Sequence, residues 1–290
     1  MFRVGFYQGY DMNRLILVDG HNLLFQMFFG MPSKIVGKGG QPIQGVIGFI
    51  GAINRIINAY QPTHLCVIFD GESGCTRKEI LEDYKANRPD WSSVSDDENP
   101  FTQLPYIYDA LDYMGVKHAE TIACETDDVI ASYALKYGMD CEVIISSFDS
   151  DYFQLINKNV KVLRYRGDSS LLCDEKYIFD KYGITPEGYL DYKCLVGDTA
   201  DNVKGVKGVG PKTASKLINT YGDLESIIER ASEIESERIR LAITDSVEIL
   251  KRNVSLIKLA GGADIPFPLD EVKFDSPSMR TMEIIRGIGI

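Results

Sequence analysis

The chain has 290 residues, 44% of them hydrophobic, with 31 Lys and Arg against 42 Asp and Glu and a net charge of −11. No run of about 18 apolar residues occurs, which argues against a membrane-spanning helix, and the first 13 residues lack the apolar core of a signal peptide. The six cysteines form no CxxC pair, as expected for reduced thiols. We therefore expect a cytoplasmic protein with no membrane partner.

Four short apolar runs predict buried strands at 14–18, 64–69, 142–146 and 160–165. Helical patterns lie between or beside them, at 44–60, 103–114 and 126–138. Buried strands that alternate with helices predict an α/β fold with a mostly parallel central sheet flanked by helices. In such sheets ligands bind beyond the carboxyl ends of the strands.

Carboxylates are concentrated where these elements begin or end. Asp19, Asp70 and Asp149 each come directly after a predicted strand, so three strands deliver an acid to one sheet edge. Together with three acids at the start of a predicted helix, one two residues after Asp149 and two in the GDTADN stretch, they predict a divalent-cation site, because so much negative charge cannot converge without counter-ions. The full set is Asp19, Asp70, Glu125, Asp127, Asp128, Asp149, Asp151, Asp198 and Asp201.

The acids at 125–128 have an alternative explanation. Glu125 and Asp128 share one face at the start of a helix for which Thr126 is the expected N-cap, and acids are favoured there by the helix dipole. The strand-end acids favour the metal site. Without the nine predicted site acids, 33 of the 42 Asp and Glu remain against 31 Lys and Arg, so the rest of the protein is close to neutral.

Residues 71–100 form a long polar connection of a kind that is uncommon unless it is functional or disordered. Its first half carries Arg77, Lys78, Lys85 and Arg88. The functional interpretation is a mobile lid whose basic residues contact phosphate, and the alternative is a flexible insertion with solvated charges.

A glycine-rich stretch, 201–222, follows a helical pattern at 189–196. Gly205, Gly208 and Gly210 predict a tight turn before a helix that starts near Pro211, and such turns expose backbone N–H groups to phosphate. Since Pro211 separates Gly210 from Lys212, the stretch does not match a nucleotide P-loop. We expect a helix–turn–helix that holds a nucleic-acid backbone without reading bases, with a plain helical hairpin as the alternative. Its lysines are Lys204, Lys207, Lys212 and Lys216.

Five motifs together resemble the 5′-nuclease family, which includes the 5′–3′ exonuclease domain of bacterial DNA polymerase I, phage 5′-exonucleases and flap endonucleases. They are VDGHN, the strand-end Asp70, ETDDVIAS, FDSDYFQL and LVGDTADNVKGVKGVGPKTA, in the family's order from about Met12 to about Tyr221. The resemblance implies a stand-alone form with a PIN-like core. Residues 1–188 would form this metal-dependent nuclease core, including a helical arch or lid at 71–102. Residues 189–290 would form a helical DNA-binding domain with a helix-three-turn-helix, its glycine hairpin at 202–213.

The resemblance also implies a function: a structure-specific 5′–3′ DNA exonuclease or flap endonuclease of replication or repair, hydrolysing phosphodiester bonds with two Mg²⁺ or Mn²⁺ ions. The first ion would be held mainly by Asp19, Asp70, Glu125, Asp127 and Asp128. The second would be held mainly by Asp149, Asp151, Asp198 and Asp201. Catalytic contacts to phosphate would come from Lys85, Arg88 and Arg77.

The glycine hairpin would hold duplex DNA and a K⁺ ion, through Lys204, Gly205, Lys207, Gly208, Gly210, Lys212 and Thr213. The implied partner is branched or 5′-ended DNA, such as a flap or a nicked duplex, bound by a monomer. Ser150 stands where many relatives have lysine, so we expect the second site to be more negative here. Residues 1–11 precede the family's usual start and have no assigned role. A PIN-like ribonuclease and a non-catalytic DNA-structure-binding protein remain as alternatives.

Overall fold

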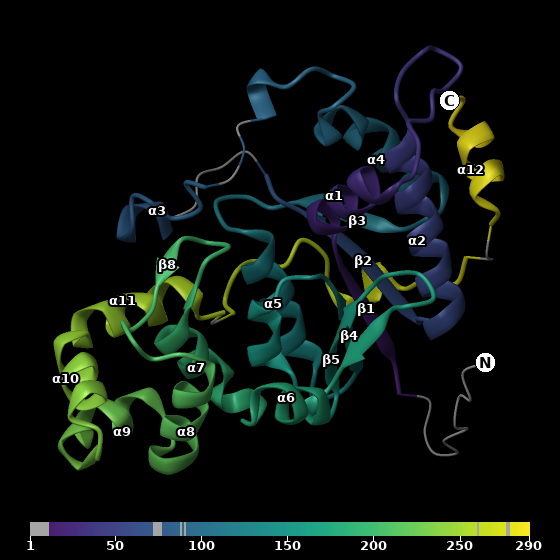
Figure 1. The fold of residues 1–290 in the computed structure, drawn as a ribbon. Helices are drawn as coiled ribbons and strands as arrows, with labels where there is room; N and C mark the ends of the chain where they lie inside the picture. Colours follow the sequence, from purple (N-terminus) through teal and green to yellow (C-terminus); the bar gives the residue numbers. More distant parts are fainter. Residues whose placement is uncertain (1–11, 72–76, 88, 90, 260, 277–278) are drawn as a thin grey trace.

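A computed structural model describes residues 12–71, 77–87, 89, 91–259, 261–276 and 279–290 (Figure 1). A six-stranded sheet in the order β3-β2-β1-β4-β5-β6 forms its centre. The first five strands in this order are parallel and β6 pairs antiparallel with β5. This confirms the mostly parallel α/β sheet. The strands are β1 (Arg14–Asp19), β2 (His64–Phe69), β3 (Lys117–Glu120), β4 (Glu142–Ser146), β5 (Val160–Arg164) and β6 (Leu171–Cys173).

Helices cover both faces of the sheet. Alternation along β1 sends Ile16 and Val18 into a core with α1, α2, α4 and α12, whereas Leu15 and Leu17 enter the core on the opposite face, which includes α5. The predicted helices are confirmed within one residue at either end. The covering helices are α1 (Gly20–Gly30), α2 (Gln44–Tyr60), α4 (Leu104–Tyr113), α5 (Thr126–Tyr137) and α12 (Thr281–Gly287).

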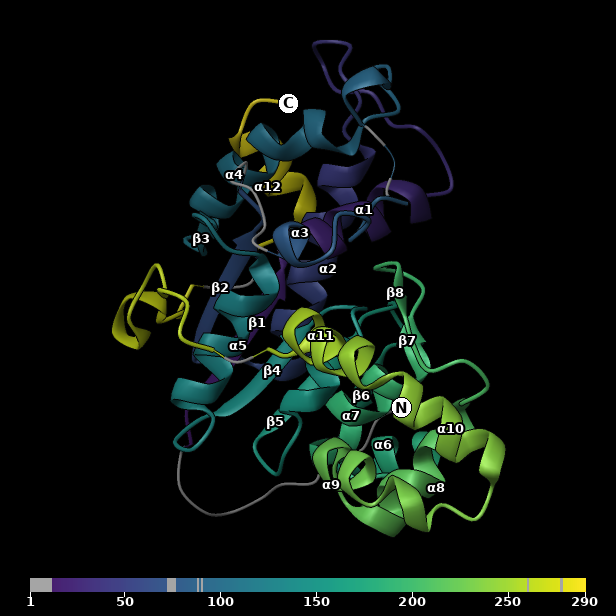
Figure 2. The ribbon, with the colours of Figure 1, turned by 90° about the vertical axis from the view of Figure 1, so that its left-hand side faces the viewer.

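A second group of helices continues the α5-side core. Figure 2 shows α8, α9 and α10 gathered at the end of the molecule away from α4 and α12. The group consists of α6 (Glu175–Tyr182), α7 (Tyr189–Val196), α8 (Pro211–Tyr221), α9 (Leu224–Glu229), α10 (Glu237–Asp245) and α11 (Val247–Ile257). None of the helices in the described part of the chain is long and apolar enough to cross a membrane.

Helices α7 and α8 and the glycine turn between them match the expected helix–turn–helix, and their connection also contains a short hairpin. A two-stranded antiparallel hairpin, β7 (Gly197–Asp198) and β8 (Val203–Lys204), stands between the two helices, and the glycine turn follows it. The fully buried Asn253 of α11 donates to the carbonyl oxygens of Cys194 and Lys204 and so fixes this hairpin. A buried amide bonded in this way holds the hairpin in one position.

The basic segment at 77–87, here called the arch segment, begins with the short helix α3 (Arg77–Ile80). The arch segment lies against the β7–β8 hairpin. Asn87 donates to the carbonyl oxygen of Thr199 at 3.1 Å, and Asn202 donates to that of Asp83 at 3.0 Å. Arg88 lies outside the described residues, so its contact with phosphate stays a prediction.

Candidate metal centre and nucleic-acid interface

Four of the predicted acids meet in one cavity at the carboxyl edge of the sheet. Asp19 ends β1, Asp70 follows β2, Asp149 follows β4, and Asp127 comes from the first turn of α5. Together with Lys85 they line a cavity of about 700 Å³. The strand-end acids therefore converge at one edge, as expected from the order of the strands.

Hydrogen bonds hold these carboxylates in place. Asp19 accepts from Ser147 Oγ at 2.9 Å, and Asp127 accepts from the buried Tyr152 hydroxyl at 2.8 Å. Asp70 accepts from the backbone N–H of Thr126 at 2.8 Å. This bond corrects the expected capping role of Thr126: the N-cap of α5 is Glu125, and the Thr126 hydroxyl has no hydrogen-bond partner among the described residues.

The cavity concentrates carboxylates. Burial, followed by repulsion from neighbouring carboxylates, raises the pKa of Asp19 and that of Asp127 to about 8, and the same causes raise the pKa of Asp149 to about 6. Burial would also raise the pKa of Asp70, but its hydrogen bonds with His21 and Thr126 outweigh burial and lower it. Lys85 is the one Lys or Arg among the described residues that line this cavity, and four carboxylates around it offer the oxygen ligands that a hard divalent cation such as Mg²⁺ or Mn²⁺ prefers.

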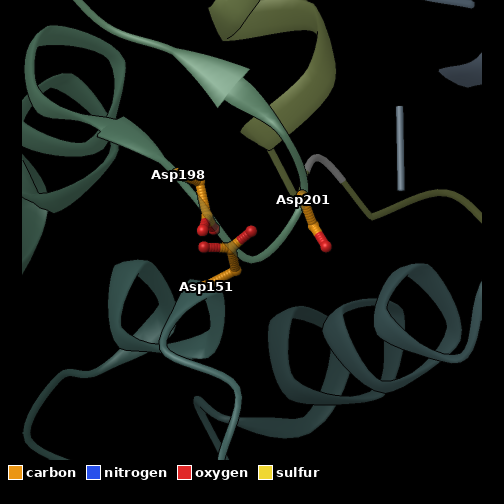
Figure 3. Close-up of side chains that lie close together, drawn as sticks. All are labelled: Asp151, Asp198 and Asp201. Atoms are coloured by element: carbon orange, nitrogen blue, oxygen red, sulfur yellow. The ribbon is translucent and has the colours of Figure 1, made fainter. Parts of the chain in front are cut away.

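Three further acids form a second cluster beside the first. Asp151, Asp198 and Asp201 each place one carboxylate oxygen within 4.8 Å of the others. Figure 3 shows Asp198 and Asp201 on the β7–β8 hairpin, facing Asp151 from the other side. Asp149 links the two groups, because the charges of Asp151 and Asp201 act on its pKa although it lines the first cavity.

A lysine that the sequence analysis did not single out lies in this second cluster. Lys193 of α7 is buried, with Nζ 2.6 Å from Asp151 Oδ1 and bonded to Asp198 Oδ2. Its Nζ is also 3.3 Å from Ser150 Oγ. Lys193 thus places a positive charge beside Ser150, and the comparison with relatives that have lysine at position 150 stays a prediction. The sequence signal that could have identified Lys193 is its position only five residues before the predicted ligand Asp198.

Glu125 and Asp128 do not line the cavity. Arg77 bonds both carboxylates, and Lys85 bonds Glu125. Tyr84 donates to Glu125 and also to Asp201, at 3.4 and 3.3 Å. These bonds connect the arch segment to both groups of acids.

Arg77 and Lys85 have different surroundings. Arg77 is only 7% exposed and is bonded to carboxylates, which places it among the acids and not on the surface of the cavity. Lys85 lines the cavity and adopts a left-handed φ of 57°, which is uncommon for a residue other than glycine. Its backbone N–H donates to the carbonyl oxygen of Asp201 at 3.1 Å.

Aromatic side chains form an apolar wall of the same cavity. Phe25 makes edge-on contacts with Trp91 and Phe101, with ring centroids 5.2 and 5.3 Å apart. Phe29 packs on Trp91 and is 60% exposed. The sequence analysis missed this wall; the spacing of Phe25 and Phe29 on one helix face was the available signal.

The glycine turn before α8 places its lysines on the surface. Lys204, Lys207 and Lys212 are exposed, and Thr213 is half-buried. A Cβ on Gly205 would lie 2.3 Å from the carbonyl carbon of Val196, so only glycine fits this close approach. Of the other two predicted turn glycines, Gly208 has a φ of 85°, whereas Gly210 precedes α8 with extended backbone. The start of α8 has no side-chain cap, which leaves its backbone N–H groups available to an anion.

A parallel sheet that gathers acids for divalent ions, joined to a lysine-bearing helical unit, defines the class of metal-dependent nucleases. Two family models match the chain: "5'-3' exonuclease, N-terminal resolvase-like domain" over residues 14–183 and "5'-3' exonuclease, C-terminal SAM fold" over residues 184–280. The chain belongs to the 5'-3' exonuclease family, which confirms the resemblance found in the sequence.

Individual relatives agree with this assignment. The chain is 32% identical over 273 residues to the 5'-3' exonuclease of Aquifex aeolicus, covering 94% of this chain and 90% of that protein. It is 33% identical over 266 residues to the DNA polymerase I of Rhizobium leguminosarum, but the match covers 89% of this chain and only 25% of the polymerase. The chain thus spans about a quarter of that polymerase.

Among solved structures, the flap endonuclease of bacteriophage T5, in a complex with DNA and metal ions, superimposes with a TM-score of 0.72 at 22% identity. The match covers 94% of this chain and 100% of the phage chain. This likeness confirms the PIN-like nuclease fold.

Proposed function

We propose that this chain is a structure-specific 5′–3′ DNA nuclease, an exonuclease or flap endonuclease of replication or repair, that hydrolyses phosphodiester bonds with two divalent ions. The observation that carries the proposal is the convergence of Asp19, Asp70, Asp127 and Asp149 in one cavity beside the Asp151–Asp198–Asp201 cluster. In this proposal residues 1–188 form the catalytic core and residues 189–290 the DNA-binding domain, except that α12 near the end of this second range packs against α2 and α4 of the core.

The two groups of acids suit one ion each. Asp19, Asp70 and Asp127 would hold the first ion, and Asp151, Asp198 and Asp201 the second, with Asp149 between them. Two such ions, Mg²⁺ or Mn²⁺, supply an activated water and stabilise the departing oxygen when they are bound. The raised pKa values of Asp19 and Asp127 support this arrangement, since a bound cation would offset both the burial and the repulsion that raise them.

We do not assign Glu125 and Asp128 as metal ligands in this proposal. They hold Arg77 and Lys85 in place. Lys85 lines the cavity and would neutralise charge that develops on the phosphoryl oxygens. Arg77 is buried among carboxylates, so it would position the arch segment instead of contacting phosphate.

The aromatic wall gives the cavity a means to bind an unpaired 5′ end. Stacking of bases on aromatic rings tolerates any sequence and contributes about 1–3 kcal/mol per base. Phe25, Phe29 and Trp91 offer such rings next to the acids. An unpaired nucleotide stacked there would bring its phosphate toward the carboxylate edge.

The lysines of the glycine turn would bind the duplex. Lys204, Lys207 and Lys212 are exposed around a turn whose N–H groups suit phosphate, and such contacts position DNA without reading its sequence. The proposal also includes a K⁺ ion that backbone carbonyls bind at this turn. It further includes that the protein acts as a monomer.

Digestion of end-labelled substrates tests the proposed function. The wild type and Asp149→Asn are incubated with 5′-flap, nicked and single-stranded DNA, and with a matched RNA flap, in Mg²⁺, Mn²⁺ or chelator. We expect the wild type to cleave branched or 5′-ended DNA only with metal, and Asp149→Asn to lose most turnover while it binds DNA in Ca²⁺. Trp91 is the single tryptophan of the chain and lines the cavity, so its fluorescence reports binding independently of cleavage.

Other outcomes identify the alternatives. A preference for the RNA flap would indicate a ribonuclease. Tight DNA binding without cleavage under any metal would indicate a non-catalytic DNA-binding protein. A near wild-type rate for Asp149→Asn would contradict the assignment of the acids.

A further inference from the structure

Lys193 contacts two of the three carboxylates that could hold a cation at the second cluster. Its side chain is 9% exposed, and its Nζ lies 2.6 Å from Asp151 Oδ1 and bonds Asp198 Oδ2. The second oxygen of Asp198, Oδ1, is already engaged, because it accepts from the backbone N–H of Ala200 at 2.8 Å. The ammonium group therefore covers the Asp198 oxygen that faces Asp151.

Lys193 is also the partner of Asp151. Asp151 Oδ1 is buried, lies 2.6 Å from Lys193 Nζ and has no other hydrogen-bond partner among the described residues. A divalent ion, which binds carboxylate oxygen at about 2.0–2.6 Å, would therefore have to share this oxygen with the ammonium group or displace it.

We infer that Lys193 is a built-in counter-ion of the second carboxylate cluster, which holds Asp151 and Asp198 together in the metal-free protein and competes with a divalent ion for their oxygens. Its charge would then set the affinity of the second metal site. This inference rests on the proposed function and adds to it a positioning residue for the second ion.

The geometry also indicates that the charge can come from another position. Ser150 Oγ lies 3.3 Å from Lys193 Nζ. A lysine at position 150 has a longer side chain than serine, so its ammonium group can reach the space that Lys193 fills. Moving the lysine from 193 to 150 should therefore restore the counter-ion from the other side of the cluster.

Calorimetric titration with Mn²⁺ and the melting temperature of the metal-free protein test the inference. The variants are Lys193→Met, Lys193→Gln, the swap Ser150→Lys with Lys193→Met, and Asp151→Asn. Lys161→Met is the matched control: Lys161 is also ion-paired, with Glu142 at 2.8 Å, and the pair joins β5 to the first residue of β4, away from the acids.

We expect Lys193→Met to bind the second ion about tenfold more tightly or better, which is the size of effect that one charge has on a neighbouring carboxylate. The metal-free variant should melt at a lower temperature, because two buried acids lose their partner, and Mn²⁺ should raise its melting temperature by more than in the wild type. Lys161→Met should keep the wild-type affinity, and the swap should return both readouts toward the wild type. If Lys193→Met does not fold without metal, Lys193→Gln should show the same increase in affinity.

Unchanged or weaker binding of the second ion in Lys193→Met or Lys193→Gln would overturn the inference and leave Lys193 a purely structural ion pair. A swap that folds but does not restore the affinity would overturn it as well. Failure of the proposed function itself would look different: the wild type would bind no Mn²⁺, and Asp151→Asn would be indistinguishable from it.

Discussion

Arg77 and Asp128 form a bidentate ion pair that joins the arch segment to the first turn of α5. The guanidinium donates from Nη2 to Oδ1 at 2.7 Å and from Nη1 to Oδ2 at 3.0 Å. Nη1 also bonds Glu125, and the Arg77 side chain is 9% exposed. Two acids that the sequence analysis assigned to a metal ion are therefore used to anchor a segment that carries Lys85.

Arg77→Met should destabilise the metal-free protein by about 3–5 kcal/mol, because it leaves two carboxylates without their buried partner. Arg77→Lys should cost less, since it keeps the charge but loses the planar fork. Urea denaturation measures both. Arg230→Met is the control: its partner Glu233 is exposed, and stability should stay unchanged. An equally stable Arg77→Met variant would show that the ion pair does not anchor the segment.

Gly205→Ala should destabilise the protein by about 1–3 kcal/mol or more, because the new Cβ would overlap the backbone of Val196 and Gly197. Duplex binding should weaken with it, since the turn carrying Lys204 and Lys207 would move. Gly210→Ala offers a matched comparison, as a Cβ there meets no atom within 4 Å. Equal effects of the two substitutions on urea denaturation would rule out the close approach as the reason for glycine at 205.

Replacing Lys207 and Lys212 together with Ala should weaken duplex binding and flatten its salt dependence. Each phosphate that a lysine no longer neutralises reduces the slope of log K against log salt by about 0.9, so the slope of the double variant should fall by up to about 1.8. Fluorescence anisotropy in Ca²⁺ at several salt concentrations measures this slope. The control, Lys136→Ala with Lys158→Ala, removes two exposed lysines from elsewhere on the core. A salt slope equal to that of the wild type in the first double variant would remove these lysines from the DNA interface.

The metal-free protein should lose stability as pH rises from about 5 to 8.5. Burial and neighbouring acids raise the pKa of Asp19 and Asp127 to about 8 and that of Asp149 and Asp151 to about 6. The folded state then binds more protons than the unfolded state, so stability is fully present at low pH and is lost as pH passes the raised pKa values.

Saturating Mg²⁺ should remove most of this pH dependence, because the ion takes the place of the protons at the carboxylates. Thermal melting from pH 5.5 to 8.5, in chelator and in Mg²⁺, measures the difference. Asp127→Asn should flatten the metal-free curve. A metal-free melting temperature that rises across this range would contradict the account of the acidic cavity.

Much of the fold could be predicted because β1, β2 and β4 are continuous apolar runs that the sheet buries on both faces. The edge strand β3 was missed because three of its four residues, KHAE, are polar and the strand is partly exposed, and β6 because it has three residues. Helix α1 was missed too, although Asp19 caps it by accepting from Asn22 N at 3.1 Å. One residue here both ends a strand and starts a helix, and the sequence analysis used only the first role.

The convergence of the acids could be predicted from strand order, but their partners could not. Lys193 and Ser150 are 43 positions apart, and Arg77 and Asp128 are 51 apart, so these pairings depend on tertiary packing that no local pattern encodes. The aromatic wall was missed for the same reason, because Trp91 meets Phe25 only after the chain folds. Roles of individual acids at the two ions stay predictions.

Anomalous diffraction from crystals soaked in Mn²⁺ tests the central claim most directly. We predict two Mn²⁺ peaks, one among Asp19, Asp70, Asp127 and Asp149, and one among Asp151, Asp198 and Asp201. Crystals of Asp127→Asn should weaken or lose the first peak, and crystals of Asp151→Asn the second. A wild-type map without Mn²⁺ at either group of carboxylates would contradict the account.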